Sequence, residues 1–366
     1  MPKYSFRVVA CILLVISVFL SGCGLFGSDD VKKEIDPPKD VTYMEDSKEL
    51  QQTDSSLEKS DEELSTKEGE ELQTHKRVLY LIDKNGLVVP QTVDLPATKE
   101  VAKQVLEYLV VDGPISNVLP NGFRAVLPQG TVVQGVNIKE DGTAIVDFSK
   151  EFTEYKPEDE EKILQAITWT LTQFDTIKKV KLWINGHELQ EMPVNGTPIS
   201  VEGVSRVDGI NMITTSVVDI TDTKPLTVYY LAEQDGQVYY VPVTKRISNS
   251  EKDMVKAAVQ ELIEGPGMAT GLLSDFQSEV KLLENPIYED NKVTLNFNKA
   301  IYNSFDEESK MISENVLNAL VLTVTEQQGI ESVVIQVDGE QDLVDENGNK
   351  LTKPVSRPEI VNTGSF

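Results

Sequence analysis

The chain contains the same series of motifs twice, and this repetition constrains the fold more than any other feature of its 366 residues. The stretch EKILQAITWTLTQFDTIKKVKLWING (161–186) returns as ENVLNALVLTVTEQQGIESVVIQVDG (314–339), 153 positions later and without a gap. Three further blocks repeat in the same order: VLYLIDKNGLVVP (78–90) as VYYLAEQDGQVYYVP (228–242), EYLVVDGP (107–114) as QELIEGP (260–266), and AIVDFSKEF (144–152) as VTLNFNKAI (293–301). The offsets stay between 149 and 153, so the sequence predicts two tandem copies of one module.

Each copy predicts the same order of secondary structure, ββαββαβ. A hairpin comes first, because an Asn-Gly or Asp-Gly pair accepts the positive φ of a two-residue turn. A helix follows and should end at a Gly-Pro pair, where glycine takes the left-handed cap and proline cannot continue the helix. A second hairpin, a second helix and a last strand complete the copy. In the first copy these features are, in order, Asn85-Gly86, helix 98–111, Gly113-Pro114, Asp141-Gly142, a helix opening at Pro157 and strand 180–184. In the second copy they are Asp235-Gly236, helix 250–264, Gly265-Pro266, Asp290-Asn291 and strand 333–337.

These patterns predict an α+β fold of two tandem homologous modules, each a small antiparallel or mixed sheet with two helices packed on one face. Apolar residues at helical spacing, such as Ile163, Ile167 and Leu171, should face the sheet. Residues 293–297 alternate between apolar and polar, as in a strand with one wet face. Each copy has about 120 residues, enough for its own core, so we expect each to fold independently.

The start of the chain has the pattern of an export signal. Lys3 and Arg7 precede the apolar run VVACILLVISVFL, whose thirteen residues fall short of the roughly 20 that a membrane helix needs. Leu20-Ser21-Gly22-Cys23 resembles the bacterial lipobox, in which the cysteine sulfur takes a diacylglycerol and becomes the first mature residue. A plain export signal, or one membrane helix with a chance cysteine, is the alternative. We therefore expect cleavage after Gly22, fatty acyl (palmitate) chains at Cys23, and anchoring on the extracytoplasmic face of the cell membrane.

The expected division of the chain starts from this signal. It comprises a lipoprotein signal peptide (1–22), the lipidated cysteine with a disordered acidic tether (23–76), a first domain (77–200), a linker (201–225), a second domain (226–340) and a C-terminal tail (341–366). Residues 24–76 contain sixteen Asp and Glu against seven Lys and few residues that could build a core, so the tether should stay solvated. A lone amphipathic helix over 47–64 is the alternative.

Cysteine and charge exclude several classes of function. Cys11 lies in the segment to be removed, so the mature chain has no disulfide, zinc–cysteine site or catalytic thiol besides the lipidated residue. Removing residues 1–22 deletes Lys3 and Arg7 and no acid, which lowers the formal charge from −26 to −28. Such a surface repels nucleic acid and anionic lipid headgroups. We expect no nucleic-acid partner, and membrane attachment through the acyl chains alone.

Few residues suggest catalysis or metal binding. The two histidines are His75 in the tether and His187 at a turn, and no nucleophile or phosphate-loop motif is present. Paired carboxylates would suit a glycosidase, but Asp147 is replaced by Asn296 in the second copy. DENGNK starts at Asp345 like a calcium loop; however, Lys350 and Ser356 stand where glycine and glutamate are needed, so a hairpin turn explains it better. We expect no cofactor and no metal.

The aromatic residues leave two interpretations open. Trp183 lies on the last strand of the first copy, where the second has Gln336, and four tyrosines crowd the first hairpin of the second copy: Tyr229, Tyr230, Tyr239 and Tyr240. Core packing and cross-strand pairing explain them most simply. Alternatively, an outward-facing subset and the exposed strand edges bind a partner protein.

The lipobox, the acidic linker, and the motifs VDGP (111–114), LPQGT (127–131) and TAIVDFSKEF (143–152) resemble the GerM family of sporulation and spore-germination lipoproteins, whose repeated module is called the GerMN domain. The resemblance covers nearly all of residues 1–340. It implies an α+β module similar to the ring-building domains of secretion-system proteins. It also implies a role in the envelope of the sporulating cell, where other envelope proteins would be partners in the complex that connects mother cell and forespore.

The second copy departs from the family pattern in one loop. Residues 275–279 read DFQSE where the first copy has LPQGT, so a surface formed there is not duplicated. The resemblance together with the missing chemistry predicts a non-enzymatic lipoprotein that assembles or stabilises an envelope complex through protein contacts, with homo-oligomerisation left open. An extracellular ligand-sensing or cortex glycan-processing lipoprotein is the alternative, and it requires a concave site with convergent polar groups.

Overall fold

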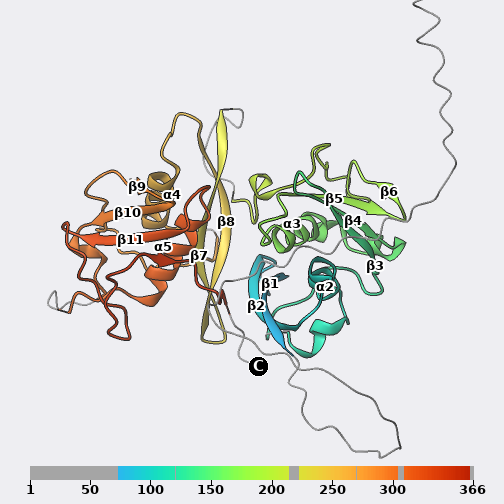
Figure 1. The fold of residues 1–366 in the computed structure, drawn as a ribbon, viewed down its shortest axis with the longest axis horizontal. Helices are drawn as coiled ribbons and strands as arrows, with labels where there is room; N and C mark the ends of the chain where they lie inside the picture. The colour runs from blue at the N-terminus through green and yellow to red at the C-terminus, as the bar shows by residue number, and fades with distance from the viewer. Residues whose placement is uncertain (1–72, 120, 214–221, 269, 304–308, 363–366) are drawn as a thin grey trace, which may run out of the picture. The chain divides into compact units, whose positions relative to one another are not determined.

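The computed structural model describes residues 73–362 apart from 120, 214–221, 269 and 304–308. The predicted signal peptide, Cys23 and most of the acidic tether lie outside the described residues. Within the described ranges, two successive sets of elements follow the predicted ββαββαβ order, each with one further short strand (Figure 1). The same ranges contain no helix with the length and apolar character needed to cross a bilayer.

The elements of the first module are β1 (Thr74–Ile82), β2 (Val88–Pro96), α2 (Val101–Glu107), β3 (Val133–Ile138), β4 (Thr143–Phe148), α3 (Glu160–Leu171), β5 (Lys179–Ile184) and β6 (His187–Glu188). Those of the second are β7 (Thr223–Gln234), β8 (Gln237–Ser248), α4 (Met254–Glu264), β9 (Ile287–Glu289), β10 (Lys292–Phe297), α5 (Glu314–Thr325), β11 (Ser332–Val337) and β12 (Val355–Ser356). Strand β1 begins three residues before the predicted domain start at 77, so His75 lies in a strand and not in the tether.

The strands of each module divide between two sheets. In the first module β1 and β2 form a separate two-stranded sheet, and the other four strands form a sheet in the order β3-β4-β5-β6. The second module repeats this with β7-β8 and with β12-β11-β10-β9. The pairs β4–β5 and β10–β11 are parallel, and the remaining pairs are antiparallel. The predicted α+β fold of two tandem modules is confirmed, and the four-stranded sheets are mixed.

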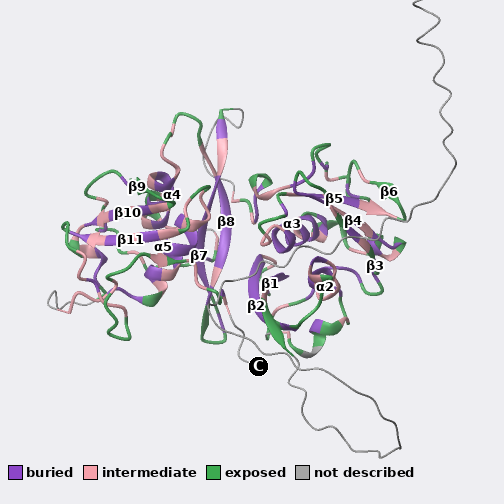
Figure 2. Ribbon diagram, in the orientation of Figure 1, coloured by how far each residue is buried: buried purple, intermediate pink, exposed green. Residues whose placement is uncertain are grey.

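The second helix of each module lies between its hairpin and its four-stranded sheet. Helix α3 contacts β1 and β5, and α5 contacts β7 and β11. Both helices are buried on nearly every side, from Ile163 to Leu171 in α3 and from Val316 to Val324 in α5 (Figure 2). A helix that is apolar all round needs cover all round. This explains why one sheet with both helices on a single face, as the sequence suggested, is replaced by two sheets that enclose a helix.

A repeated hydrogen bond ties each hairpin to its central helix. The Tyr80 N–H donates to Thr170 Oγ1 over 3.0 Å, and the Tyr229 N–H donates to Thr323 Oγ1 over 2.8 Å. All four residues are buried, so these bonds satisfy strand donors that have no access to water. The recurrence of threonine at these two helix positions therefore has a structural cause.

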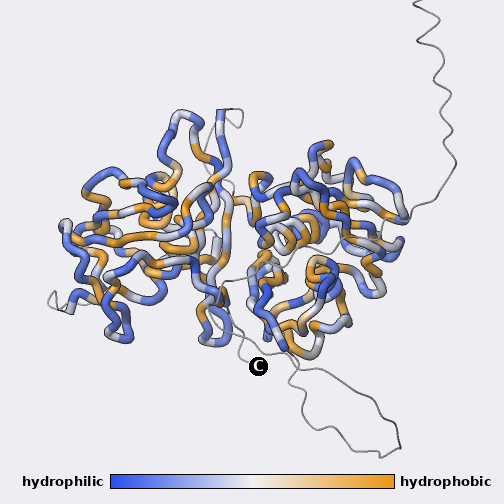
Figure 3. Tube along the Cα trace, in the orientation of Figure 1, coloured by the Kyte–Doolittle hydropathy of each residue, from blue (hydrophilic) through white to orange (hydrophobic). Residues whose placement is uncertain are grey.

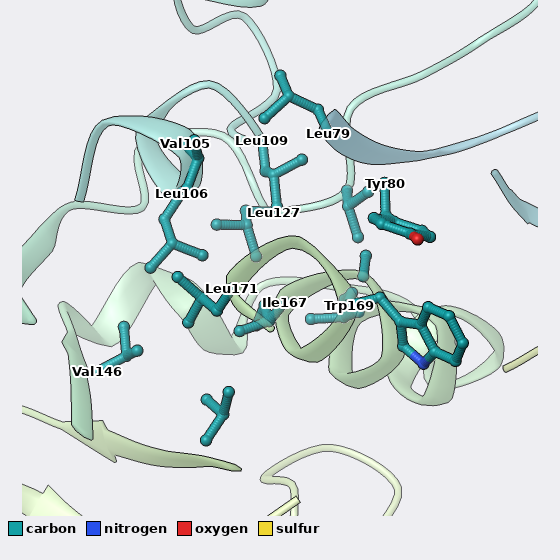
Figure 4. Close-up of a cluster of buried hydrophobic side chains, with 14 of the residues drawn as sticks. Leu79, Tyr80, Val105, Leu106, Leu109, Leu127, Val146, Ile167, Trp169 and Leu171 are labelled. Carbon is teal, nitrogen blue, oxygen red and sulfur yellow. The ribbon is translucent and has the colours of Figure 1, made fainter. Parts of the chain in front are cut away.

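The first core is built mainly from leucine, valine and isoleucine around α3. Figure 4 shows the side chains of Leu79, Leu109 and Leu127 above Ile167 and Leu171 of that helix, all of them fully buried. Hydropathy follows the same plan, with apolar stretches along helices and strands and hydrophilic residues concentrated in the loops (Figure 3).

Neither predicted glycine cap has the left-handed helical form. Gly265 ends α4 with a positive φ of 81°, which favours glycine, but its ψ of 179° is extended. Gly113 instead has a φ of −82°, and the preceding Asp112 takes the positive value of 57°. Gly113 is needed for another reason: a Cβ atom there would lie 2.8 Å from the carbonyl oxygen of Val110. The left-handed cap predicted at Gly113 is therefore wrong.

The predicted linker and tail contain packed structure. Ile210 is fully buried, and Leu343 and Val361 are buried in the C-terminal region. Strand β12 lies within residues 341–366, which were expected to be a tail, and it pairs with β11. The packed part of each module therefore extends beyond the predicted ends at 200 and 340.

Candidate interaction surfaces

The residues that sequence analysis considered for chemistry do not converge. His75 is exposed on β1, and His187 is exposed on β6, where it pairs with Ile184 at the edge of a sheet. Among the described residues, no three His, Cys, Asp or Glu side chains are placed to hold a metal ion.

Asp147 caps a turn. Both of its carboxylate oxygens accept the N–H of Gly186 at 3.0 Å. In the second module the Asn296 side-chain oxygen accepts the N–H of Gly339 at 2.9 Å. An amide oxygen does this as well as a carboxylate, which explains why the charge is not kept in the second copy.

Asp345 also organises a turn. Its Oδ1 accepts the N–H groups of Asn347 and Asn349, at 2.9 and 2.8 Å, and its Oδ2 accepts the Asn349 side-chain amide at 3.0 Å. The hydrogen bonds from Asn349 hold the pKa of Asp345 below its usual range. Val344 and Lys350 bridge on either side of the turn, so the predicted hairpin turn is confirmed.

Glu160, the first residue of α3, is a buried carboxylate. It is fully buried and accepts hydrogen bonds from the Tyr155 hydroxyl and from the N–H groups of Val194, Asn195 and Thr197, at 2.6 to 3.0 Å. Burial opposes ionisation of Glu160, but these donors outweigh it and lower its pKa to about 2. The carboxylate therefore fastens the 192–199 loop, and its oxygens are too fully engaged for acid–base chemistry.

The tyrosines of the β7–β8 hairpin are packed inside. Tyr229, Tyr230 and Tyr239 are buried, and the Tyr239 hydroxyl donates to Asp83 Oδ2 of the first module over 2.8 Å. Tyr240 is half-buried, with its hydroxyl 3.2 Å from Asn318 Nδ2. Core packing is the confirmed interpretation of these residues, and they do not form an outward-facing docking patch.

One group of exposed apolar side chains lies on the second module, at β9. This strand ends its sheet, because it pairs with β10 on one side and with no other strand of the described chain. Three large apolar side chains in and before it are about half exposed: Leu283 (48%), Ile287 (51%) and Tyr288 (49%). We call these three residues the β9 edge. In the first module, the corresponding edge strand β3 packs against α2.

Two grooves flank the β9 edge. The first has a volume of about 700 Å³ and is called the β9 groove; it is lined by Arg206, Val207, Pro225, Thr227, Lys252, Asp253, Met254, Val255, Tyr288, Glu326, Gln327, Gln328 and Ile330. The second, of about 610 Å³, is lined by residues 280–285 and by Lys256, Gln260, Ile263 and Glu264 of α4. Leu283 lines the second groove and Tyr288 the first, so each groove includes one residue of the β9 edge.

The sequence carried a weak signal for this surface. Residues 275–279, which precede β9 in the chain, are where the second copy departs from the LPQGT motif of the first. The two copies therefore differ at the place where one covers its edge strand and the other leaves it exposed.

Comparison with known proteins gives consistent results. The Germane family, described as "Sporulation and spore germination", matches residues 78–190 and 227–343. The spore germination protein GerM of Bacillus subtilis (strain 168) is 57% identical over 368 residues, covering all of both chains. The solved tandem GerMN domains of the sporulation protein GerM from Bacillus subtilis match with a TM-score of 0.75 at 60% identity, over 79% of this chain and all of that one.

Proposed function

The chain belongs to the Germane family of sporulation and spore germination proteins, and from this premise we propose that it is a non-enzymatic, lipid-anchored protein that assembles or stabilises an envelope complex between mother cell and forespore. Anchoring would be through Cys23, with the acidic tether holding the modules away from the membrane. The complex would be held by protein contacts, and we assign the β9 edge and its grooves to the partner.

The exposed β9 edge is the observation that carries this proposal. A sheet edge with exposed apolar side chains offers both backbone hydrogen bonds and hydrophobic contact to an incoming segment. Pro286 directly precedes β9, so backbone pairing with a partner strand would be short. Most of the affinity would then come from side chains seated in the grooves, where a few apolar anchors dominate binding. The strongly acidic chain favours a partner with basic residues around those anchors.

A ligand-sensing or glycan-processing role is the second candidate, because the β9 groove has the volume of a small-molecule site. Its carboxylates argue against hydrolysis. Glu326 is buried and paired with Arg206 and Arg357, which leaves no free acid of the kind that a glycosidase needs. Asp253 caps α4 through the Lys256 N–H and accepts the Tyr288 hydroxyl.

Placing charges on the β9 edge should block sporulation without unfolding the protein. Leu283→Glu and Ile287→Glu each put a carboxylate where the partner needs an apolar contact. Loss of such an anchor costs about 2 kcal/mol of binding, or about thirtyfold in affinity. Both side chains are half exposed, so each substitution should change the free energy of unfolding by only about 0.5 kcal/mol. Heat-resistant spore counts and thermal unfolding of each variant give the two measurements.

Val201→Glu is the matched control, because Val201 is 77% exposed and lies outside both grooves. It adds the same charge and should leave sporulation intact. Normal spore counts for both β9 variants, in proteins that fold and reach the membrane, would refute the assignment of the partner to this surface.

Replacing Asp147 with asparagine and His187 with alanine should leave sporulation unchanged. Asn296 already performs the Asp147 role in the second module, and His187 is exposed at an edge. A sporulation defect in this double variant, with normal folding and localisation, would favour a catalytic function over assembly. Spore counts beside an unfolding curve decide between the two.

A further inference from the structure

The repeat extends into both regions expected to be linker and tail. Val204-Ser205-Arg206 is followed by Ile210-Asn211, and Val355-Ser356-Arg357 is followed by Val361-Asn362, all at an offset of 151. We call residues 204–211 the first arm and residues 355–362 the second arm. Each arm starts on the last long strand of its own module, since Val204 bridges Val180 and Val355 pairs with Val333.

The two arm asparagines make the same contacts with the modules exchanged. Asn211 accepts the Val88 N–H at 2.8 Å and donates to the carbonyls of Val88 and Pro242, at 2.7 and 2.9 Å. Asn362 accepts the Tyr240 N–H at 2.7 Å and donates to the carbonyls of Tyr240 and Pro90, both at 2.8 Å. Val88 and Pro90 correspond to Tyr240 and Pro242 in the repeat. Each side-chain amide therefore bridges strands β2 and β8.

The residue before each asparagine crosses to the other module. Ile210 of the first arm exchanges two hydrogen bonds with Thr244 on β8, at 2.9 and 2.8 Å. Val361 of the second arm makes the same two with Thr92 on β2, at 2.8 and 3.2 Å, and also accepts the Thr92 hydroxyl at 2.9 Å. Thr92 and Thr244 are also equivalent in the repeat. Contacts in which equivalent residues swap roles are the signature of a two-fold, self-complementary interface.

We call the contacts that the two arms make between the modules the junction. The charged side chains of the junction do not follow its two-fold symmetry. Arg206 and Arg357 both pair with Glu326, at 2.6 and 3.3 Å. Each guanidinium also lies over an aromatic ring, Arg206 over Trp169 at 4.4 Å and Arg357 over Tyr229 at 5.2 Å. Two partly buried cations thus share one carboxylate.

The first module lacks the second carboxylate. The position equivalent to Glu326 is Gln173, whose side chain is turned to the backbone of Val78 with hydrogen bonds of 2.7 and 3.0 Å. The attraction of Arg206 and Arg357 outweighs the burial of Glu326 and holds its pKa below the usual range, so this carboxylate stays charged.

We propose that the junction is an internal form of a two-fold interface. The surface that the second module uses there can also bind the second module of another chain. Glu326 decides which pairs of modules form. A pair of second modules has two arginines and two glutamates and is balanced. A first–second pair has one glutamate. A pair of first modules would hold two partly buried guanidiniums with no counter-ion, which is unfavourable. In the intact chain the linked modules meet at high effective concentration, so they pair internally and leave the surface occupied.

The test uses the full chain with a specific protease site inserted between residues 213 and 222, folded intact and then cut. Two batches carry a donor or an acceptor dye on the second module. After cutting and mixing, energy transfer between the batches should rise as second modules from different chains pair, and uncut chains should show none. The dissociation constant between the two halves is measured on the same cut protein.

Glu326→Gln should abolish the energy transfer between second modules and weaken binding between the halves by about thirtyfold or more. Glu346→Gln is the matched control, since it removes one carboxylate from an exposed turn, and it should change neither measurement. If Glu326→Gln and Glu346→Gln give the same dissociation constant between the two halves, the role of Glu326 is overturned. Halves that separate while second modules stay monomeric would overturn the two-fold interface.

Discussion

Replacing Cys23 with alanine should release the protein from the membrane completely and abolish its labelling by fatty acid. The lipobox Leu20-Ser21-Gly22-Cys23 follows a short apolar run, and the cysteine sulfur is the atom that accepts the diacylglycerol. Each buried CH₂ of an acyl chain contributes about 0.8 kcal/mol to membrane binding, so two or more chains give stable attachment. Without them the acidic surface has no affinity for anionic lipid. Metabolic labelling and membrane fractionation measure both effects.

Cys11→Ala is the matched control, because Cys11 lies inside the segment that is to be removed. This variant should be labelled and anchored like the unchanged protein. Label retained by the Cys23 variant, or lost from the Cys11 variant, would show that the anchor has been assigned to the wrong residue.

Replacing Glu160 with glutamine should destabilise the first module by about 3 kcal/mol at neutral pH. Three backbone N–H groups and the Tyr155 hydroxyl converge on this carboxylate. Glutamine has one acceptor oxygen and turns its own N–H₂ toward these donors. Each hydrogen bond to a charged group is worth about 1.5 to 3 kcal/mol, and a buried donor left unpaired costs about 1 to 3 kcal/mol.

The effect of Glu160 should depend on pH with a defined sign. Its pKa in the folded protein is about 2, below the ordinary value of 4.5. The carboxylate therefore stabilises the fold fully above the ordinary pKa, and this stabilisation is lost as the pH falls from about 5 toward 2. Urea unfolding at pH 7 and at pH 3 should show the difference between Glu160→Gln and the unchanged protein shrinking at the lower pH.

Glu158→Gln is the control for this measurement, since Glu158 is exposed in the same acidic turn. It should change the free energy of unfolding by only about 0.5 kcal/mol. A destabilisation by Glu160→Gln that is equally small, or that does not change with pH, would contradict the role of this carboxylate in fastening the 192–199 loop.

The amino-acid sequence by itself determined the duplication, the order of strands and helices, and most turns. These features depend on neighbours along the chain: a two-residue turn needs positive φ, which Asp235-Gly236 and Asp290-Asn291 accept and adopt. The alternation in residues 293–297 likewise marks one buried strand face, and Val293, Leu295 and Phe297 are fully buried.

Only the tertiary structure decided what the polar residues do. Asp147 and Glu160 are both acids near turns or helix starts, yet one caps a turn and the other is a buried anchor, because their backbone N–H donors come from residues 34 to 39 positions away. A hydrogen bond between distant residues leaves no periodic pattern in the sequence.

The arms show the same division. The motif of Val, Ser and Arg followed by Asn is visible in the sequence as a further repeat, but its meaning depends on where the two hairpins lie in space. Asn211 and Asn362 each bridge two strands, and each asparagine is more than 100 residues along the chain from at least one of the strands that it contacts. Folding brought these groups together. The Glu326 side chain is buried and the two arginines are partly buried, so their ion pairs are stronger than they would be in water, where solvent weakens such pairs.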